Sequence, residues 1–193
     1  MIGAGLLCTT DLLAGSSSSK SRRFVAPGKL FGVKLPGQWT VHLHEKDPYT
    51  YEFRPSDPKA DAFLIIRRIK VPPGANPRQL RLQAQEKRLS KLPHFKILRE
   101  ADARVASFPA ASITATFAYQ GNLQFPRVVE ELYMVTRHEA FIFHFECFEP
   151  YAAKLSNDVN HFYKTFRPRP RRSVTLPKAL PSSTTIDPDK VPF

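Results

Sequence analysis

The stretch that decides the fold is AFIFHFECFEPYAAKLSNDVNHFYKTF, residues 140–166. In its first part a phenylalanine occupies every second position, so Phe141, Phe143 and Phe145 project from one face of a strand. From Pro150 onward, apolar residues recur at steps of three and four, which is the spacing of one helical face. This apolar stripe consists of Ala152, Leu155, Val159, Phe162 and Phe166. The stretch therefore predicts a strand that buries an aromatic face, followed by a helix that packs on a core.

The segments before this stretch have the composition of further strands. Strands are predicted over 39–43, 49–53, 62–66, 113–119 and 128–136, and residues 95–105 are predicted to form one strand or two short extended pieces. The first two form a hairpin, and 128–136 pairs with 140–148 in a second hairpin. Residues 62–66 are apolar on both faces, so they suit an interior strand.

One further helix is predicted between these strands, over residues 77–92. Asn76 supplies a capping side chain, Pro77 suits the first helical position, and Pro93 ends the pattern. Its expected apolar side consists of Leu82, Leu89 and Leu92. Strands grouped into hairpins, together with two helices, predict one α+β domain with an antiparallel sheet over 30–166.

The net charge of +12 is spread unevenly over the 193 residues. Residues 1–29 carry +3, the domain at 30–166 carries +5, and residues 167–193 carry +4. More than half of the excess therefore lies outside the predicted domain. Two cysteines exclude a disulfide scaffold, and the longest apolar runs are too short for a membrane-spanning helix.

The two ends of the chain have their own composition. Residues 1–29 begin with an apolar run that ends in Ala14-Gly15-Ser16, as in an export signal, so the mature chain is expected to begin near Ser16. Two features depart from an export signal, since Asp11 interrupts the apolar run and no cation precedes the run. The LLAG sequence at 12–15 resembles the start of a lipoprotein box, but Ser16 stands where the box has a cysteine. Residues 167–193 are rich in proline, so we expect an extended, disordered tail. Its basic cluster consists of Arg167, Arg169, Arg171 and Arg172.

Two motifs carry a family resemblance. FGVKLPGQW at 31–39 and HFYKTF at 161–166, in this order of strands and helices, resemble the PsbP-like proteins, whose fold is shared with the Ran-binding Mog protein. The resemblance implies an α/β/α sandwich with a central antiparallel sheet. It also implies a non-enzymatic, exported assembly or accessory factor, since many members occupy the thylakoid lumen or are bacterial lipoproteins. The basic, proline-rich tail departs from photosynthetic PsbP, which leaves a photosystem role open.

Few residues are candidates for chemistry. His42 and His44 share one strand face and could contribute to a metal site, but no third ligand is evident, so exposed histidines are the favoured interpretation. His144 and Cys147 lie three positions apart and face opposite ways, and Cys147 shares the face of the phenylalanines as a buried thiol.

Catalytic motifs are also missing from the sequence. Glu130 and Glu131 are adjacent in a strand, so they point to opposite faces and do not form a carboxylate pair. No GxSxG, HExxH, P-loop or GxGxxG motif occurs. We therefore expect no catalytic residue, no metal and no cofactor.

The competing hypothesis is nucleic-acid binding through cations on and beside the helix at 77–92. These are Arg67, Arg68, Arg78, Arg81, Lys87, Arg88 and Lys91, together with the basic tail. Such cations suffice for phosphate contacts, whereas single-strand binding also needs exposed aromatic residues. We instead expect an exported monomer that binds a protein partner, either acidic or membrane-associated, through a sheet face or a basic surface.

Overall fold

The computed structural model describes residues 21–43 and 47–169. The elements in chain order are β1 (Arg22–Val25), β2 (Phe31–Leu35), β3 (Trp39–Leu43), β4 (Thr50–Pro55), β5 (Phe63–Lys70), α1 (Pro77–Lys87), β6 (Lys96–Val105), β7 (Phe108–Tyr119), β8 (Asn122–Val135), β9 (Glu139–Phe148), α2 (Glu149–Thr165) and β10 (Arg167–Pro168). Short 3-10 turns lie at Pro27–Lys29, Pro58–Ala60 and Leu89–Lys91.

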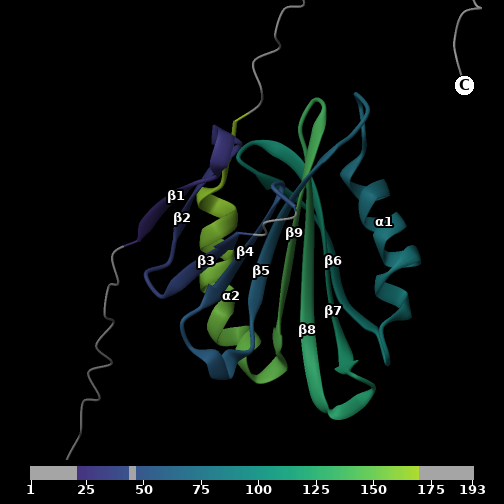
Figure 1. Ribbon diagram of the computed structural model, residues 1–193. Coiled ribbons are helices and arrows are strands. Elements are labelled where there is room, and N and C mark those ends of the chain that lie inside the picture. Colours follow the sequence, from purple (N-terminus) through teal and green to yellow (C-terminus); the bar gives the residue numbers. More distant parts are fainter. Residues whose placement is uncertain (1–20, 44–46, 170–193) are drawn as a thin grey trace, which may run out of the picture.

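A seven-stranded antiparallel sheet forms the centre of the molecule. Its strand order is β3-β4-β5-β9-β8-β7-β6. The helix α2 and a small sheet of order β1-β2-β10 cover one face, and α1 lies against β7 and β8 on the other (Figure 1). The predicted α+β sandwich around a central antiparallel sheet is confirmed, as are both predicted hairpins and the interior position of β5.

The main core lies between the large sheet and α2. Phe162 is fully buried, and its ring centroid lies 5.0 Å from that of Trp39 and 5.3 Å from that of Phe53. Trp39 also donates a hydrogen bond from Nε1 to Asp158 Oδ2 at 2.8 Å, which satisfies its one polar atom. The Trp39 amide donates to the Pro36 carbonyl at 3.0 Å, so the turn in the first motif positions this anchor.

The helix α1 packs less deeply than its sequence predicts. Asn76 caps it as expected, because Asn76 Oδ1 accepts a hydrogen bond from the Arg78 amide at 2.8 Å. The helix ends at Lys87, however, and none of its residues is buried. Leu82 is 51% exposed, so its predicted place in the core is wrong, whereas Leu89 in the following 3-10 turn is fully buried.

The folded part extends beyond the predicted boundaries of 30 and 166. The strand β1 pairs with β2 on one side, and β10 pairs with β2 on the other. Isolated four- and two-residue strands have little pattern of their own, so their pairing depends on the neighbouring strand. The expectations for the export signal, for Arg171 and Arg172, and for His44 fall outside the described residues.

None of the helices in the described ranges is both long enough and apolar enough to cross a membrane.

Candidate functional site

An open region of the central sheet lies beside α1. The helix covers β7 and β8, which leaves the outward side chains of β3, β4, β5 and β9 uncovered. The strand register aligns these side chains in rows across the sheet. One row runs through His42, Glu52, Ile65, His144 and Glu131, and the next runs through Thr40, Arg54, Phe63 and Glu146. We call this surface the open face.

A cluster of charged and polar side chains marks the border between the open face and α1. Glu131 has no solvent exposure, and its carboxylate lies 2.5 Å from His144 Nδ1 and 2.5 Å from the Arg88 guanidinium. The Tyr133 hydroxyl donates a further short hydrogen bond to the same carboxylate. Glu146 lies on the other side of the imidazole, 3.4 Å from Nε2. We call these groups the Glu131 cluster.

The pKa values in the Glu131 cluster follow from its burial and its charges. Burial opposes ionisation of Glu131, but hydrogen bonds from His144 and Arg88 outweigh it and lower the pKa of the carboxyl to about 2. Burial alone would lower the pKa of His144. The hydrogen bonds to Glu131 and Glu146 reverse this effect and raise that pKa above its ordinary value. The cluster therefore favours a buried carboxylate beside a protonated imidazole.

A cavity of about 330 Å³ opens beside this cluster. Its lining residues are Ile65, Arg67, Ala84, Arg88, Glu131, Tyr133, Ile142 and His144. These eight described residues include no serine, threonine or cysteine that His144 could activate. The raised pKa of His144 favours its charged form more than in a free histidine. The cavity is thus lined by fixed charges beside apolar side chains, as the binding of a ligand group requires.

The Glu131 cluster makes stability depend on pH. Protonated His144 stabilises the fold fully below the pKa of a free histidine, about 6.5, and this contribution is lost as the pH rises through the higher folded-state pKa. The ionised Glu131 contributes above its ordinary pKa of 4.5, and this contribution is lost as the pH falls towards 2. We expect the unfolding free energy, measured by urea titration, to fall as the pH rises above about 6.5.

A substitution isolates this effect. In His144→Gln the decline above pH 6.5 should be smaller than in the wild-type protein, because the titrating imidazole is gone. His42→Gln is the matched control, since His42 is exposed in the same row of the sheet. An equal decline in all three proteins would contradict the assignment of the pH dependence to His144.

The middle of the open face combines rings and charges. The Phe63 ring stacks on the His144 imidazole with centroids 5.8 Å apart, and the Arg54 guanidinium lies 5.9 Å from the same phenyl ring. Arg54 also pairs with Glu52, and the Arg67 Nε donates to Thr50 Oγ1 at 3.3 Å. These contacts hold the exposed guanidinium groups of Arg54 and Arg67 in fixed positions, beside the buried carboxylate of Glu52.

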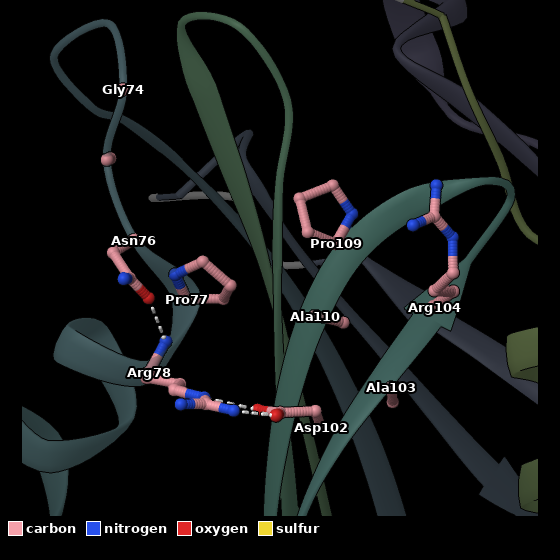
Figure 2. A pocket seen from close by; sticks show the side chains of 10 residues that line it. Gly74, Asn76, Pro77, Arg78, Asp102, Ala103, Arg104, Pro109 and Ala110 are labelled. Carbon is pink, nitrogen blue, oxygen red and sulfur yellow. Dashed lines mark hydrogen bonds and ion pairs between the residues drawn. The ribbon is translucent and has the colours of Figure 1, made fainter.

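A second, larger hollow of about 520 Å³ lies at the start of α1 (Figure 2). The loop from Gly74 to Arg78 forms one side, and the β6–β7 hairpin forms the other. Arg78 reaches across to Asp102 with two hydrogen bonds, of which that from Nε is 2.6 Å long. Because both side chains are more than half exposed, this ion pair contributes little stability. The hollow lacks the buried polar anchors of the Glu131 cluster, so we regard it as the weaker candidate.

The structure separates the histidines that the sequence singled out. His42 is exposed on β3, and three strand spacings, about 14 Å, separate it from His144 in the same row. Within the described residues, no group of three or more His, Cys, Asp or Glu side chains has the geometry to hold a metal ion.

Cys147, Glu130 and Glu131 lie on the strand faces that the alternation of side chains along a strand predicts for them. Cys147 is fully buried, and burial raises the pKa of its thiol to about 12. Glu130 and Glu131 lie on opposite faces of β8, as expected from their adjacency. Glu130 faces α2, and its burial raises the pKa of the carboxyl.

The cations proposed for nucleic-acid contacts are largely paired with acids. Arg78, Arg81 and Arg88 pair with Asp102, Glu100 and Glu131 respectively. Arg68 lies on the core side of β5, where it is buried and pairs with Glu139. The cations near α1 therefore do not form one continuous basic surface.

Sequence reasoning missed the Glu131 cluster, although one signal was present. Glu131, Tyr133 and His144 each lie on the α1-facing side of their strands, and the hairpin register places Glu131 opposite His144. A buried polar pair can be predicted once this register is known. The contribution of Arg88 depends on where α1 docks, which no local pattern encodes.

Comparisons with known proteins agree with this architecture. No protein-family model and no curated protein sequence matches the chain. Among solved structures, LpqN of Mycobacterium tuberculosis, involved in cell envelope biogenesis, is 15% identical with a TM-score of 0.58, over 80% of this chain and 88% of that one. A cyanobacterial PsbP from Synechocystis is 10% identical with a TM-score of 0.56, over 80% and 96%. The Ran-binding protein Mog1p of Saccharomyces cerevisiae is 8% identical with a TM-score of 0.55, over 78% and 96%.

These likenesses define the class of protein by its fold. The chain has the Mog/PsbP-like fold, as its two motifs and its order of elements led us to expect. At these identities the comparisons establish the architecture and leave the activity to be argued from the surface.

Proposed function

We propose that this chain is a non-enzymatic accessory protein that binds a protein partner through the open face. The observation that carries the proposal is the uncovered half of the sheet, where apolar and charged side chains are held in register. Phe63, Ile65 and Ile142 are partly exposed at its centre, and Arg54 and Arg67 are exposed around them. An apolar centre with a polar surround is typical of protein interfaces.

The chemistry of the open face favours a partner with carboxylate groups. The guanidinium groups of Arg54 and Arg67 project beside Phe63, and arginines next to aromatic rings are common anchors in interfaces. Glu52 and Glu146 lie on the same face, where they pair with Arg54 and Arg127 of this chain.

The similar structures support this type of role. Mog1p is described as a Ran-binding protein and LpqN as a protein of cell envelope biogenesis. We infer by analogy that the chain acts outside the cytoplasm, in agreement with the export signal expected in residues 1–29.

Nucleic-acid binding is the second candidate. It is favoured by the net charge of +12 and opposed by the ion pairs of Arg78, Arg81 and Arg88. Titration of short DNA and RNA across salt concentrations separates the two hypotheses, because phosphate contacts make affinity fall steeply with salt.

The partner site is tested by charge reversal. The wild-type protein is used to isolate a partner from the native envelope fraction, and the affinity of the purified partner is then measured for each variant. Arg54→Glu with Arg67→Glu should weaken binding at least about tenfold, because two anchors at the centre of the face are inverted.

The matched control reverses two exposed cations on the small sheet and its adjoining turn. Arg23→Glu with Lys29→Glu changes the net charge equally and lies away from the open face. Its affinity should equal that of the wild-type protein. Equal losses in the two double variants would indicate a general charge effect and contradict the proposed site.

A further inference from the structure

The β7–β8 hairpin ends in an exposed apolar tip. Tyr119 is 41% exposed, Leu123 66% and Phe125 49%. Gln120 and Gly121 adopt positive φ values of 51° and 78°, so the chain reverses tightly and projects these side chains outward. In Figure 1 this hairpin forms the lower end of the coloured ribbon. We call Tyr119, Leu123 and Phe125 the hairpin tip.

The surrounding sequence is free of charge over an unusual length. No charged side chain occurs between Arg104 and Arg127, although 24% of the whole chain is charged. The polar residues at the turn are the amides Gln120, Asn122 and Gln124. Amides and aromatic rings tolerate an interface between water and hydrocarbon, whereas a charge would resist transfer from water.

The base of the hairpin is held firmly. The Arg127 guanidinium is 2% exposed and lies between the rings of Tyr119 and Phe148, at 5.1 Å and 5.0 Å. It pairs with Asp61 and Glu146, each at 2.5 Å. The Phe125 ring packs on Phe148 with centroids 6.2 Å apart. The tip is therefore presented by a fixed support.

Basic residues lie alongside the hairpin. The Ala118 amide donates to the Pro93 carbonyl at 2.9 Å, and Lys96 pairs with Thr116 in the strand register. The short segment from Lys91 to Lys96 thus follows the hairpin and contributes two lysines and His94. On the other side Glu149 starts α2 after Phe148, while Asp61 is neutralised by Arg127.

We propose that the hairpin tip inserts into the interfacial region of a phospholipid bilayer that contains anionic lipids. The apolar tip supplies buried area in the interface, and Lys91 and Lys96 meet the negative lipid headgroups beside it. The net charge of +12 attracts the whole chain to the same surface. This proposal shares no residue with the variants that test the open face, so it stands or fails separately.

A bilayer fits the tip better than other occupants. The most exposed residue, Leu123, is aliphatic and offers no ring on which a nucleic-acid base could stack. A two-residue turn at the end of a hairpin is convex, whereas proteins that bind single strands use grooves. A convex apolar tip can enter the interface of a bilayer, and the lysines beside it can contact anionic headgroups.

Vesicle binding tests the proposal with the full chain. Partition is measured by sedimentation with vesicles of phosphatidylcholine alone and with about 30% phosphatidylglycerol. The wild-type protein should bind the anionic vesicles. Leu123→Ser with Phe125→Ser should reduce the partition coefficient at least about tenfold, because two exposed apolar side chains no longer leave water.

The matched control removes apolar surface elsewhere. Leu43 and Leu82 are 57% and 51% exposed and lie on β3 and α1, so Leu43→Ser with Leu82→Ser deletes comparable area away from the tip. Its partition should equal that of the wild-type protein. Lys91→Glu with Lys96→Glu should weaken binding to the anionic vesicles and reduce its salt dependence.

Three outcomes would overturn the proposal. The first is no binding of the wild-type protein to anionic vesicles, and the second is equal binding by the wild-type protein and the Leu123→Ser/Phe125→Ser variant. In the third, that variant binds vesicles normally but loses affinity for a short single-stranded oligonucleotide, which would assign the tip to nucleic acid. Circular dichroism of the variants checks that each is folded, as expected for exposed positions.

Discussion

Phe162→Ala should lower the free energy of unfolding by about 3–5 kcal/mol. The side chain is fully buried and packs edge-on against Trp39, with Phe53 on its other side. Removing the ring leaves a cavity between α2 and the sheet, since neither neighbour is free to move into it. Chemical denaturation monitored by Trp39 fluorescence measures the change directly.

Asn160→Ala provides the control within the same helix. Asn160 is exposed on α2, so its substitution should change the unfolding free energy by no more than about 0.5 kcal/mol. A loss below about 1 kcal/mol in Phe162→Ala would mean that the α2 stripe is not part of the core.

Arg127→Met should destabilise the protein by about 3 kcal/mol. The guanidinium is 2% exposed and neutralises Glu146, which is 15% exposed, and Asp61, which is about half exposed. Methionine fills much of the volume between the two rings but removes the cation nearest to the Glu146 carboxylate, which keeps only the His144 imidazole at 3.4 Å. The cost arises from this poorly compensated charge in a poorly solvated site.

A second substitution separates the loss of stability that is due to charge from the loss that is due to packing. Adding Glu146→Gln to Arg127→Met removes the poorly compensated charge and should recover part of the lost stability in a double-mutant cycle. Lys87→Met deletes an exposed cation on α1 and should have little effect. If Glu146→Gln lowers the free energy of unfolding of the Arg127→Met variant further, the destabilisation comes from lost packing and the explanation by charge is wrong.

The sequence predicted the sheet and α2 well, because the spacing of apolar residues within a single strand or helix shows which of its faces is buried. Alternation identified the aromatic face of β9, and the stripe ending in Phe166 identified the buried side of α2. The capping residue Asn76 fixed the start of α1 for the same local reason.

The predictions that were wrong or missing concern features that depend on contacts between helices and strands. Leu82 has the spacing of a core residue, but α1 packs over β7 and β8 with this residue facing solvent. The strands β1 and β10 acquire their conformation by pairing with β2, so their own residues carry little signal. The Glu131 cluster requires three segments to meet, and its ionised carboxylate follows from partners that are distant in sequence.

The position of β2 affects when the protein can complete its fold during synthesis. This strand lies between β1 and β10, and Phe31 on it packs against Phe166, with ring centroids 5.1 Å apart. Phe24 and Tyr51 contact Phe31 from nearby in the sequence, but Phe166 is separated from it by almost the whole described chain, and such distant contacts form slowly. A nascent chain released up to β9 would still lack the contact of Phe31 with Phe166, so the small sheet can close only after α2 and β10 have left the ribosome.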